Sequence, residues 1–178
     1  MHKLSHFVGN EWIEHSFAPV FAIEEERITG GVPGGDASVF EALVTCLSGP
    51  ILVLYILHTP RGEANPGRYQ SPELSMNDFR AFIGKYREFL SSDARFDIWA
   101  HSPHDHATVV WERHNKFFAY GLLPQFVSQL RAKGFDEGTI RPLGAHQHHY
   151  RAEQDSLAMS LICEYQWSYS PLRPEDEQ

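Results

Sequence analysis

The strongest constraint on the fold is a change of hydrophobic period near residue 95. From Ser75 to Leu90, apolar side chains recur at intervals of three and four residues, after a Ser-Met-Asn-Asp start that suits a helix cap. From Phe96 to Tyr120, apolar side chains instead fall in three short runs separated by polar turns. The first pattern indicates an amphipathic helix and the second a meander of strands. A helix followed by a meander favours an α+β fold.

Other segments add elements of both kinds. The continuous apolar run Ile51–Leu57 has the length of a strand and predicts a central strand covered on both faces. The remaining expected elements are a helix capped at Ser38 and stopped at Gly49-Pro50, a helix opened by Pro124 and closed by Gly134-Phe135, a strand over 139–143 that extends in one interpretation to His149, and a helix over 152–165. The last segment also alternates as a strand would, and both interpretations stay open. We therefore expect a single α+β domain with a mixed, mainly antiparallel sheet and three to four helices packed on it.

The regularity of these patterns divides the chain into three parts. Residues 1–35 are the least regular and predict an N-terminal arm or hairpin followed by a glycine-rich joint over 30–35. Residues 36–170 carry the periodic patterns and predict the single α+β domain. Residues 171–178 are polar and interrupted by proline, which is typical of a frayed C-terminal tail.

Charge limits the partners that such a protein can bind. The chain has 15 Lys and Arg residues against 23 Asp and Glu, which gives a formal net charge of −8. That balance argues against nucleic acid and against an anionic membrane as partners. It suits a protein that docks on a basic protein partner.

The expected compartment is the cytoplasm. The first residues show no signal-peptide pattern, and the longest apolar run is far shorter than the roughly 18 residues of a membrane helix. Cys46 and Cys163 both lie in apolar periodic stretches without a C-x-x-C motif, which predicts two buried thiols in a reducing compartment.

Histidines are the most conspicuous candidates for chemistry. The chain has 11 of them, and two local groups stand out: one in a predicted hairpin loop and one at the end of a later strand. Positions i and i+2 of a strand point the same way, so His146 and His148 would present two imidazoles on one face. If the turn with His104 and His106 lies beside them, the four side chains make a candidate zinc site with an open position for water. Histidines with a purely structural role are the alternative.

A second candidate is a binding surface on the meander, and it depends on the strand register. If Trp99 lies opposite Trp111, Asp97 lies opposite Arg113, and one face carries an aromatic pair beside a charge pair. A register shifted by one residue instead puts Trp99 opposite Val110. In either register, a covering helix would make the tryptophans part of the core.

The segment from residue 58 to residue 74 supplies a third candidate site. It is a long polar connection that carries Arg61, Arg68 and Tyr69 in an otherwise acidic chain. Two arginines on a loop can hold a carboxylate or phosphate in bidentate fashion. A solvated connection without a ligand is the alternative.

Three functions follow from these candidates. The sequence has no H-E-x-x-H and no G-x-S-x-G motif, so the first expectation is a non-catalytic interaction protein that needs no cofactor and is not an enzyme. Its profile of small size and acidic charge is similar to that of bacterial immunity and antitoxin proteins. The alternatives are a metal-dependent hydrolase built on the histidines, and a small-anion-binding protein that uses residues 58–74.

Overall fold

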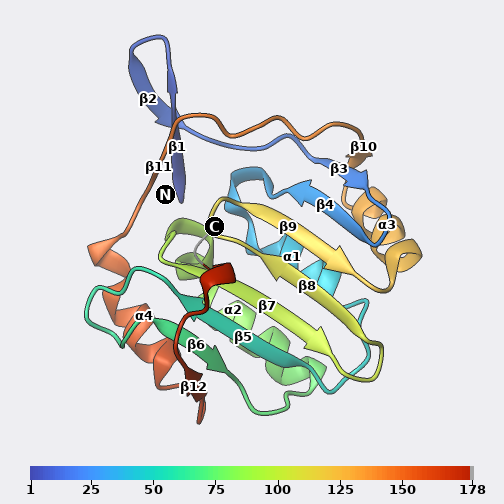
Figure 1. Ribbon diagram of the computed structural model, residues 1–178, viewed down its shortest axis with the longest axis vertical. Coiled ribbons are helices and arrows are strands. Elements are labelled where there is room, and N and C mark those ends of the chain that lie inside the picture. Colours follow the sequence, from blue (N-terminus) through green and yellow to red (C-terminus); the bar gives the residue numbers. More distant parts are fainter. Residues whose placement is uncertain (177–178) are drawn as a thin grey trace.

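The computed structural model describes residues 1–176 and confirms the α+β fold (Figure 1). Its main sheet has nine strands, all antiparallel to their neighbours except for one parallel pair at the edge. Their order is β10 (Asp136–Glu137), β3 (Val20–Ile23), β4 (Arg27–Gly31), β9 (Lys116–Tyr120), β8 (Ala107–Trp111), β7 (Phe96–Ser102), β5 (Leu52–Leu57), β6 (Gly67–Gln70) and β12 (Ser168–Ser170). The mixed, mainly antiparallel sheet is therefore as expected.

A second sheet has three strands and carries the N-terminal segment. Its order is β11 (His146–His148), β1 (Leu4–Val8) and β2 (Glu11–Glu14). Strands β1 and β2 form the hairpin that projects at the top of Figure 1. The predicted strand over 139–143 is wrong, because the chain there makes no ladder and pairs with β1 only from His146 onward.

Helices cover the main sheet and close the core. They are α1 (Ala37–Val44), α2 (Met76–Ser92), α3 (Leu123–Ala132) and α4 (Asp155–Ile162), with α1 and α2 behind the sheet in Figure 1. Helix α2 begins at Ser75 with a capping box made with Asp78, as its sequence predicts. Helix α1 begins two residues earlier than expected, because the Asp36 carboxylate is the cap and accepts a hydrogen bond from the amide of Ser38.

The meander places its residues by strict alternation. Phe96, Ile98 and Ala100 of β7 point into the core, and the residues between them point away. Trp111 is also fully buried, with its ring centre 6.0 Å from that of Phe40 on α1. Burial of such large rings removes a large apolar area from water and stabilises the domain.

The glycines at the predicted joint have a packing role instead. Gly30 and Gly31 lie in β4 and are buried, whereas the sequence suggested a flexible connection. A Cβ atom on Gly30 would overlap the Phe117 ring, and one on Gly31 would overlap Phe17. Two aromatic side chains therefore occupy the space that only glycine leaves open.

The C-terminal segment also differs from a frayed tail as far as the structure describes it. Asp176 is buried and accepts a hydrogen bond of 2.6 Å from Arg68, so this side chain fixes the segment to strand β6, although most residues of 171–176 are exposed. The part of the predicted tail at 177–178 lies outside the described residues.

Two further observations bear on the expected compartment. Cys163 is exposed and Cys46 is half-buried, both as free thiols, so the prediction of two buried thiols is wrong. Within residues 1–176, no helix has both the length and the apolar character that a membrane span requires.

Candidate metal site

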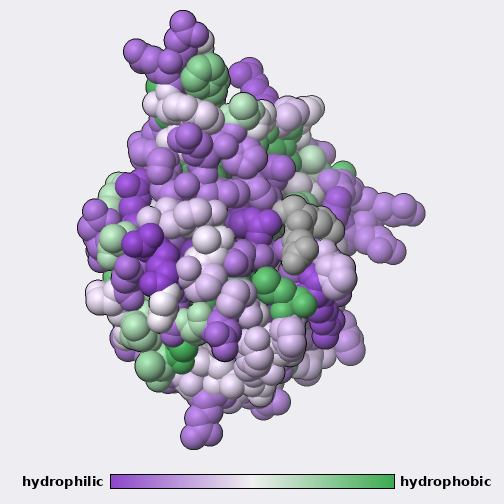
Figure 2. All heavy atoms as spheres, turned by 60° about the vertical axis from the view of Figure 1, so that its left-hand side comes forward, coloured by the Kyte–Doolittle hydropathy of each residue, from purple (hydrophilic) through white to green (hydrophobic). Residues whose placement is uncertain are grey.

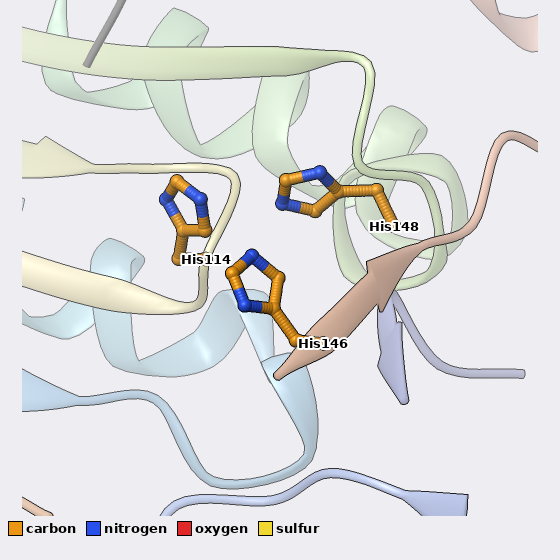
Figure 3. Close-up of side chains that lie close together, drawn as sticks. All are labelled: His114, His146 and His148. Atoms are coloured by element: carbon orange, nitrogen blue, oxygen red, sulfur yellow. The ribbon is translucent and has the colours of Figure 1, made fainter. Parts of the chain in front are cut away.

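Three histidines converge where the two sheets meet (Figure 3). His146 and His148 project from the same face of β11, as the two-residue period of a strand requires. His114 comes from the turn between β8 and β9 and points toward them. One possible ligand nitrogen from each ring lies within 4.8 Å of the other two. In a zinc site, bonds of about 2 Å put the nitrogens about 3.4 Å apart, so the rings need to close by an ångström or more.

The polar contacts of the three rings indicate which nitrogens are available to a metal ion. His146 donates from Nδ1 to the carbonyl of Gly144 at 2.9 Å, so its Nε2 is the nitrogen that can bind a metal. The carboxylate of Glu112 lies 3.6 Å from His114 Nδ1, which is slightly too far for a hydrogen bond, so it must move closer before it can orient this imidazole. His148 Nε2 is buried and has no hydrogen-bond partner among the described residues. A buried polar atom of this kind is costly unless something binds it.

Electrostatics keep His148 neutral at neutral pH. The pKa of His148 is lowered to about 4, chiefly by burial and in part by the neighbouring His114 and His146. Burial also lowers the pKa of His15, which lies close enough to His146 to respond to its charge. Neutral imidazoles at neutral pH are the form that coordinates a metal ion.

A histidine–aspartate pair lies close to the cluster. His58 Nε2 is 2.9 Å from Asp97 Oδ2, and the backbone amide of Arg113 donates to Asp97 Oδ1 at 2.7 Å. Burial raises the pKa of Asp97, but the hydrogen bonds from His58 and Arg113 outweigh it and hold that pKa below its usual value. An ionised Asp97 fixes the orientation of His58 and leaves Nδ1 as the ring nitrogen that can take up a proton.

Both features border one small hollow. It has a volume of about 300 Å³ and is lined by His58, Thr59, Arg113, His148, Tyr150 and Leu172. One metal-ligand candidate and one proton-acceptor candidate therefore face a common space. Such a combination is what a catalytic site requires.

The structure brings together only part of the metal site that the sequence predicts. His146 and His148 are in the cluster, but His104 and His106 are exposed in the turn between β7 and β8. That turn lies at the opposite end of β8 from the turn with His114. Five residues of strand separate the two turns, a distance of about 17 Å. His114 was not predicted, because nothing in the sequence indicates which end of the meander β11 approaches.

The predicted binding surface on the meander does not form. In the structure Trp99 pairs with Val110 and Ile98 with Trp111, which is the shifted register. Adjacent residues of a strand face opposite sides, so Trp111 is in the core and Trp99 is on the other face. Arg113 lines the hollow beside His148.

The candidate residues of the 58–74 segment are engaged within the protein. Part of this predicted loop is strand β6, which buries Tyr69 and directs its hydroxyl to the carbonyl of Asn65. Arg68 pairs with Asp176, and Arg61 Nε lies 3.0 Å from Asp155 Oδ1. These interactions favour a structural role for all three side chains.

No family model, curated protein or solved structure matches the chain. Its function is therefore inferred from the geometry of this site.

Proposed function

We propose that the protein binds a divalent transition-metal ion, zinc by preference, through His114, His146 and His148, and that it uses the ion for hydrolysis. The observation that carries the proposal is the convergence of the three imidazole nitrogens within 4.8 Å. Imidazole is a favoured ligand of zinc, and sites with three protein ligands keep a fourth position for water or substrate.

The chemistry of such a site is hydrolytic. Zinc lowers the pKa of a bound water molecule to about 7, which supplies a nucleophile at neutral pH. In the proposed reaction the water oxygen forms a bond to the electrophilic centre of an ester, and the bond to the leaving oxygen breaks. His58, oriented by Asp97, accepts the proton of the water and returns it to the leaving alcohol.

Metal content tests the first half of this proposal. We expect about one equivalent of zinc in untagged protein purified without chelator and then dialysed against zinc. Replacing His114, His146 or His148 with alanine should lower zinc affinity by about tenfold or more in calorimetry. The double variant His104→Ala, His106→Ala is the matched control and should bind zinc as the native chain does. Equal loss of binding in this control would contradict the assignment.

Metal-dependent hydrolysis tests the second half. Hydrolysis of an activated ester should require zinc, stop on chelation and resume when zinc is restored. His58→Gln should bind zinc normally and lose most of the rate, because glutamine cannot accept the proton. Zinc binding without any metal-dependent hydrolysis would refute the enzymatic part of the proposal.

A second function is favoured by the hairpin of β1 and β2. Four large apolar residues are exposed on it, namely Phe7, Val8, Trp12 and Ile13, and two glutamates flank the pair on β2. Figure 2 shows hydrophobic atoms beside hydrophilic ones at this projecting end. The register of the hairpin puts Phe7, Trp12 and Glu14 on one face and Val8, Ile13 and Glu11 on the other. An exposed apolar pair beside a glutamate suits a basic protein partner, in line with an immunity-like interaction protein of the cytoplasm.

A photo-crosslinking residue at position 12 tests this second function. It should capture a basic protein in a salt-sensitive manner, whereas the same residue at exposed position 133 should not. Equal capture at both positions would count against the hairpin as an interface.

A further inference from the structure

A larger cavity lies between two connections that are far apart in the sequence. One connection, residues 15–20, leads from β2 into β3, and the other, residues 139–143, leads from β10 toward β11. Figure 1 shows the two connections running alongside each other from the hairpin to the edge of the main sheet. The cavity has a volume of about 660 Å³, which is within the range of roughly 300–1,000 Å³ for small-molecule sites.

Most of the cavity wall is apolar. Six of its eleven lining residues have apolar side chains, and none of the eleven is acidic. Phe17 is buried at this wall. Ile140 and Leu143 are half-buried, and they are not among the described side chains that pack against the hydrophobic core. An apolar ligand can therefore remove more of these two side chains from water, which favours its binding.

Arg141 adds a positive charge to this wall. It is exposed, and its side chain makes no hydrogen bond or ion pair with any of residues 1–176. The planar fork of a guanidinium matches the two oxygens of a carboxylate. The donors of Arg141 are therefore available to an acidic ligand in the cavity.

The backbone of the same connection offers further donors. No amide or carbonyl group of 139–143 is hydrogen-bonded within residues 1–176. The amides of Thr139, Ile140 and Arg141 can therefore donate to a ligand oxygen.

Two imidazoles at the cavity also lack partners. His6 and His15 both line it, with their ring centres 4.9 Å apart. The Nδ1 atom of each ring is buried and has no hydrogen-bond partner among the described residues. Buried polar groups are normally hydrogen-bonded, so the protein alone leaves the polar part of this wall unsatisfied.

Charge balance favours a carboxylate over a phosphate ester. Arg141 is the one Lys or Arg side chain in the described lining, and a monocarboxylate brings one negative charge to match it. A phosphate monoester brings a charge of about −1.5 to −2 at neutral pH. The surplus charge would lie against apolar side chains, which is costly.

From these observations we infer that the cavity binds an amphipathic carboxylic acid. The carboxylate is held by Arg141 and the amides of 139–143. The apolar body packs against Phe17, Ile140 and Leu143. This inference concerns a second ligand site and does not depend on the proposed metal chemistry.

Calorimetry with 4-phenylbutanoate tests the inference. A chelator is present throughout, so that the carboxylate cannot bind through a metal ion. We expect saturable binding of the acid, and binding of the neutral 4-phenylbutanamide that is weaker by about tenfold or more.

Variants locate the two halves of the ligand. Arg141→Met should weaken binding of 4-phenylbutanoate by about tenfold or more. Arg80→Met is the matched control, because Arg80 is also exposed and without an ion pair in the described chain but lies on α2, and it should bind as the native chain does. Leu143→Ala should weaken binding by about fivefold and keep the preference for the acid over the amide.

Each contrary outcome overturns a stated part of the inference. Failure of both 4-phenylbutanoate and decanoate to bind overturns the ligand site and leaves the proposed metal site unaffected. Equal affinity for the acid and the amide overturns the choice of a carboxylate. Equal affinities of Arg141→Met and Arg80→Met for the acid overturn the placement of the carboxylate on Arg141.

Discussion

The ammonium group of Lys3 lies 3.8 Å from the centre of the Trp111 ring. The whole Lys3 side chain is buried, and its Nζ has no hydrogen-bond partner among residues 1–176. Burial lowers the pKa of Lys3 to about 7, although Asp97 and Asp93 raise it in part. The residue just before strand β1 therefore places a weakly basic amine against the Trp111 and Phe96 rings of the core, which provide its closest electrostatic support.

Replacing Lys3 with methionine should raise the free energy of unfolding at neutral and lower pH. In the folded state the pKa of Lys3 is lower than in the unfolded state, so the cost of burying its charge is fully present below about pH 7. Between about pH 7 and the pKa of 10.5 that Lys3 has in the unfolded chain, the unfolded chain binds a proton that the folded protein has lost. The native protein therefore gains stability as the pH rises through this range. The advantage of the variant should shrink by up to about 1.4 kcal/mol per pH unit in this range. Urea unfolding from about pH 6 to about pH 9.5 measures it, and a pH-independent difference would contradict the assignment.

Alanine at two glycines should have opposite effects. Gly30→Ala introduces a Cβ atom into the space of the Phe117 ring and should destabilise the fold by about 1–3 kcal/mol. Gly84→Ala, inside helix α2 with open space around it, should stabilise the fold by about 1 kcal/mol. Thermal unfolding of the two variants, compared with the native chain, shows whether packing or backbone freedom decides at each position. Equal changes in unfolding temperature for the two variants would mean that Gly30 does not pack against the Phe117 ring as described.

Arg95→Lys should destabilise the protein, although the substitution keeps the positive charge. The buried guanidinium donates twice to Asp93, at 2.9 Å from both Nε and Nη2, and once to Glu63 at 3.0 Å. A lysine ammonium lacks this planar fork and leaves buried carboxylate oxygens without partners, at a cost of about 3 kcal/mol. Urea unfolding gives the value, and a change below about 1 kcal/mol would show that the network contributes little.

The C-terminal segment should contribute to stability through its ion pair. Arg68→Met leaves Asp176, whose side chain is only 1% exposed, without its cation and should cost about 3–5 kcal/mol. Arg61→Met removes an arginine from a more exposed pair and should cost less than about 1 kcal/mol. Similar unfolding free energies for the two variants would indicate that residues 173–176 detach readily in solution.

The elements with strong local periodicity were predictable from the sequence. Helix α2 and the meander follow from the spacing of their apolar residues, and the cap at Ser75 follows from its own side chain. The sequence left open whether Trp99 pairs with Trp111 or with Val110. The two pairings differ by one residue in the length of the β7–β8 turn, and the sequence pattern alone fits both. Strand β4 was missed, because its Gly30 is required by a contact with the Phe117 ring, which lies far away in the sequence.

The candidate site was predictable only within a single strand. The two-residue period correctly put His146 and His148 on one face. The third histidine depends on how the short strand β11 docks against the meander, which is a tertiary relationship with no local signal. His58 and Asp97 were likewise separated in sequence and are joined by the pairing of β5 with β7.

The position of the histidine cluster has a mechanical consequence. His146 and His148 belong to the three-stranded sheet, whereas His114 belongs to a turn of the nine-stranded one, and within residues 1–176 no ladder joins these sheets. An ion bound by all three histidines would cross-link the two sheets. Its binding energy would add to the stability of the native arrangement alone, so removal of the ion would first loosen the N-terminal hairpin and β11 from the rest of the molecule.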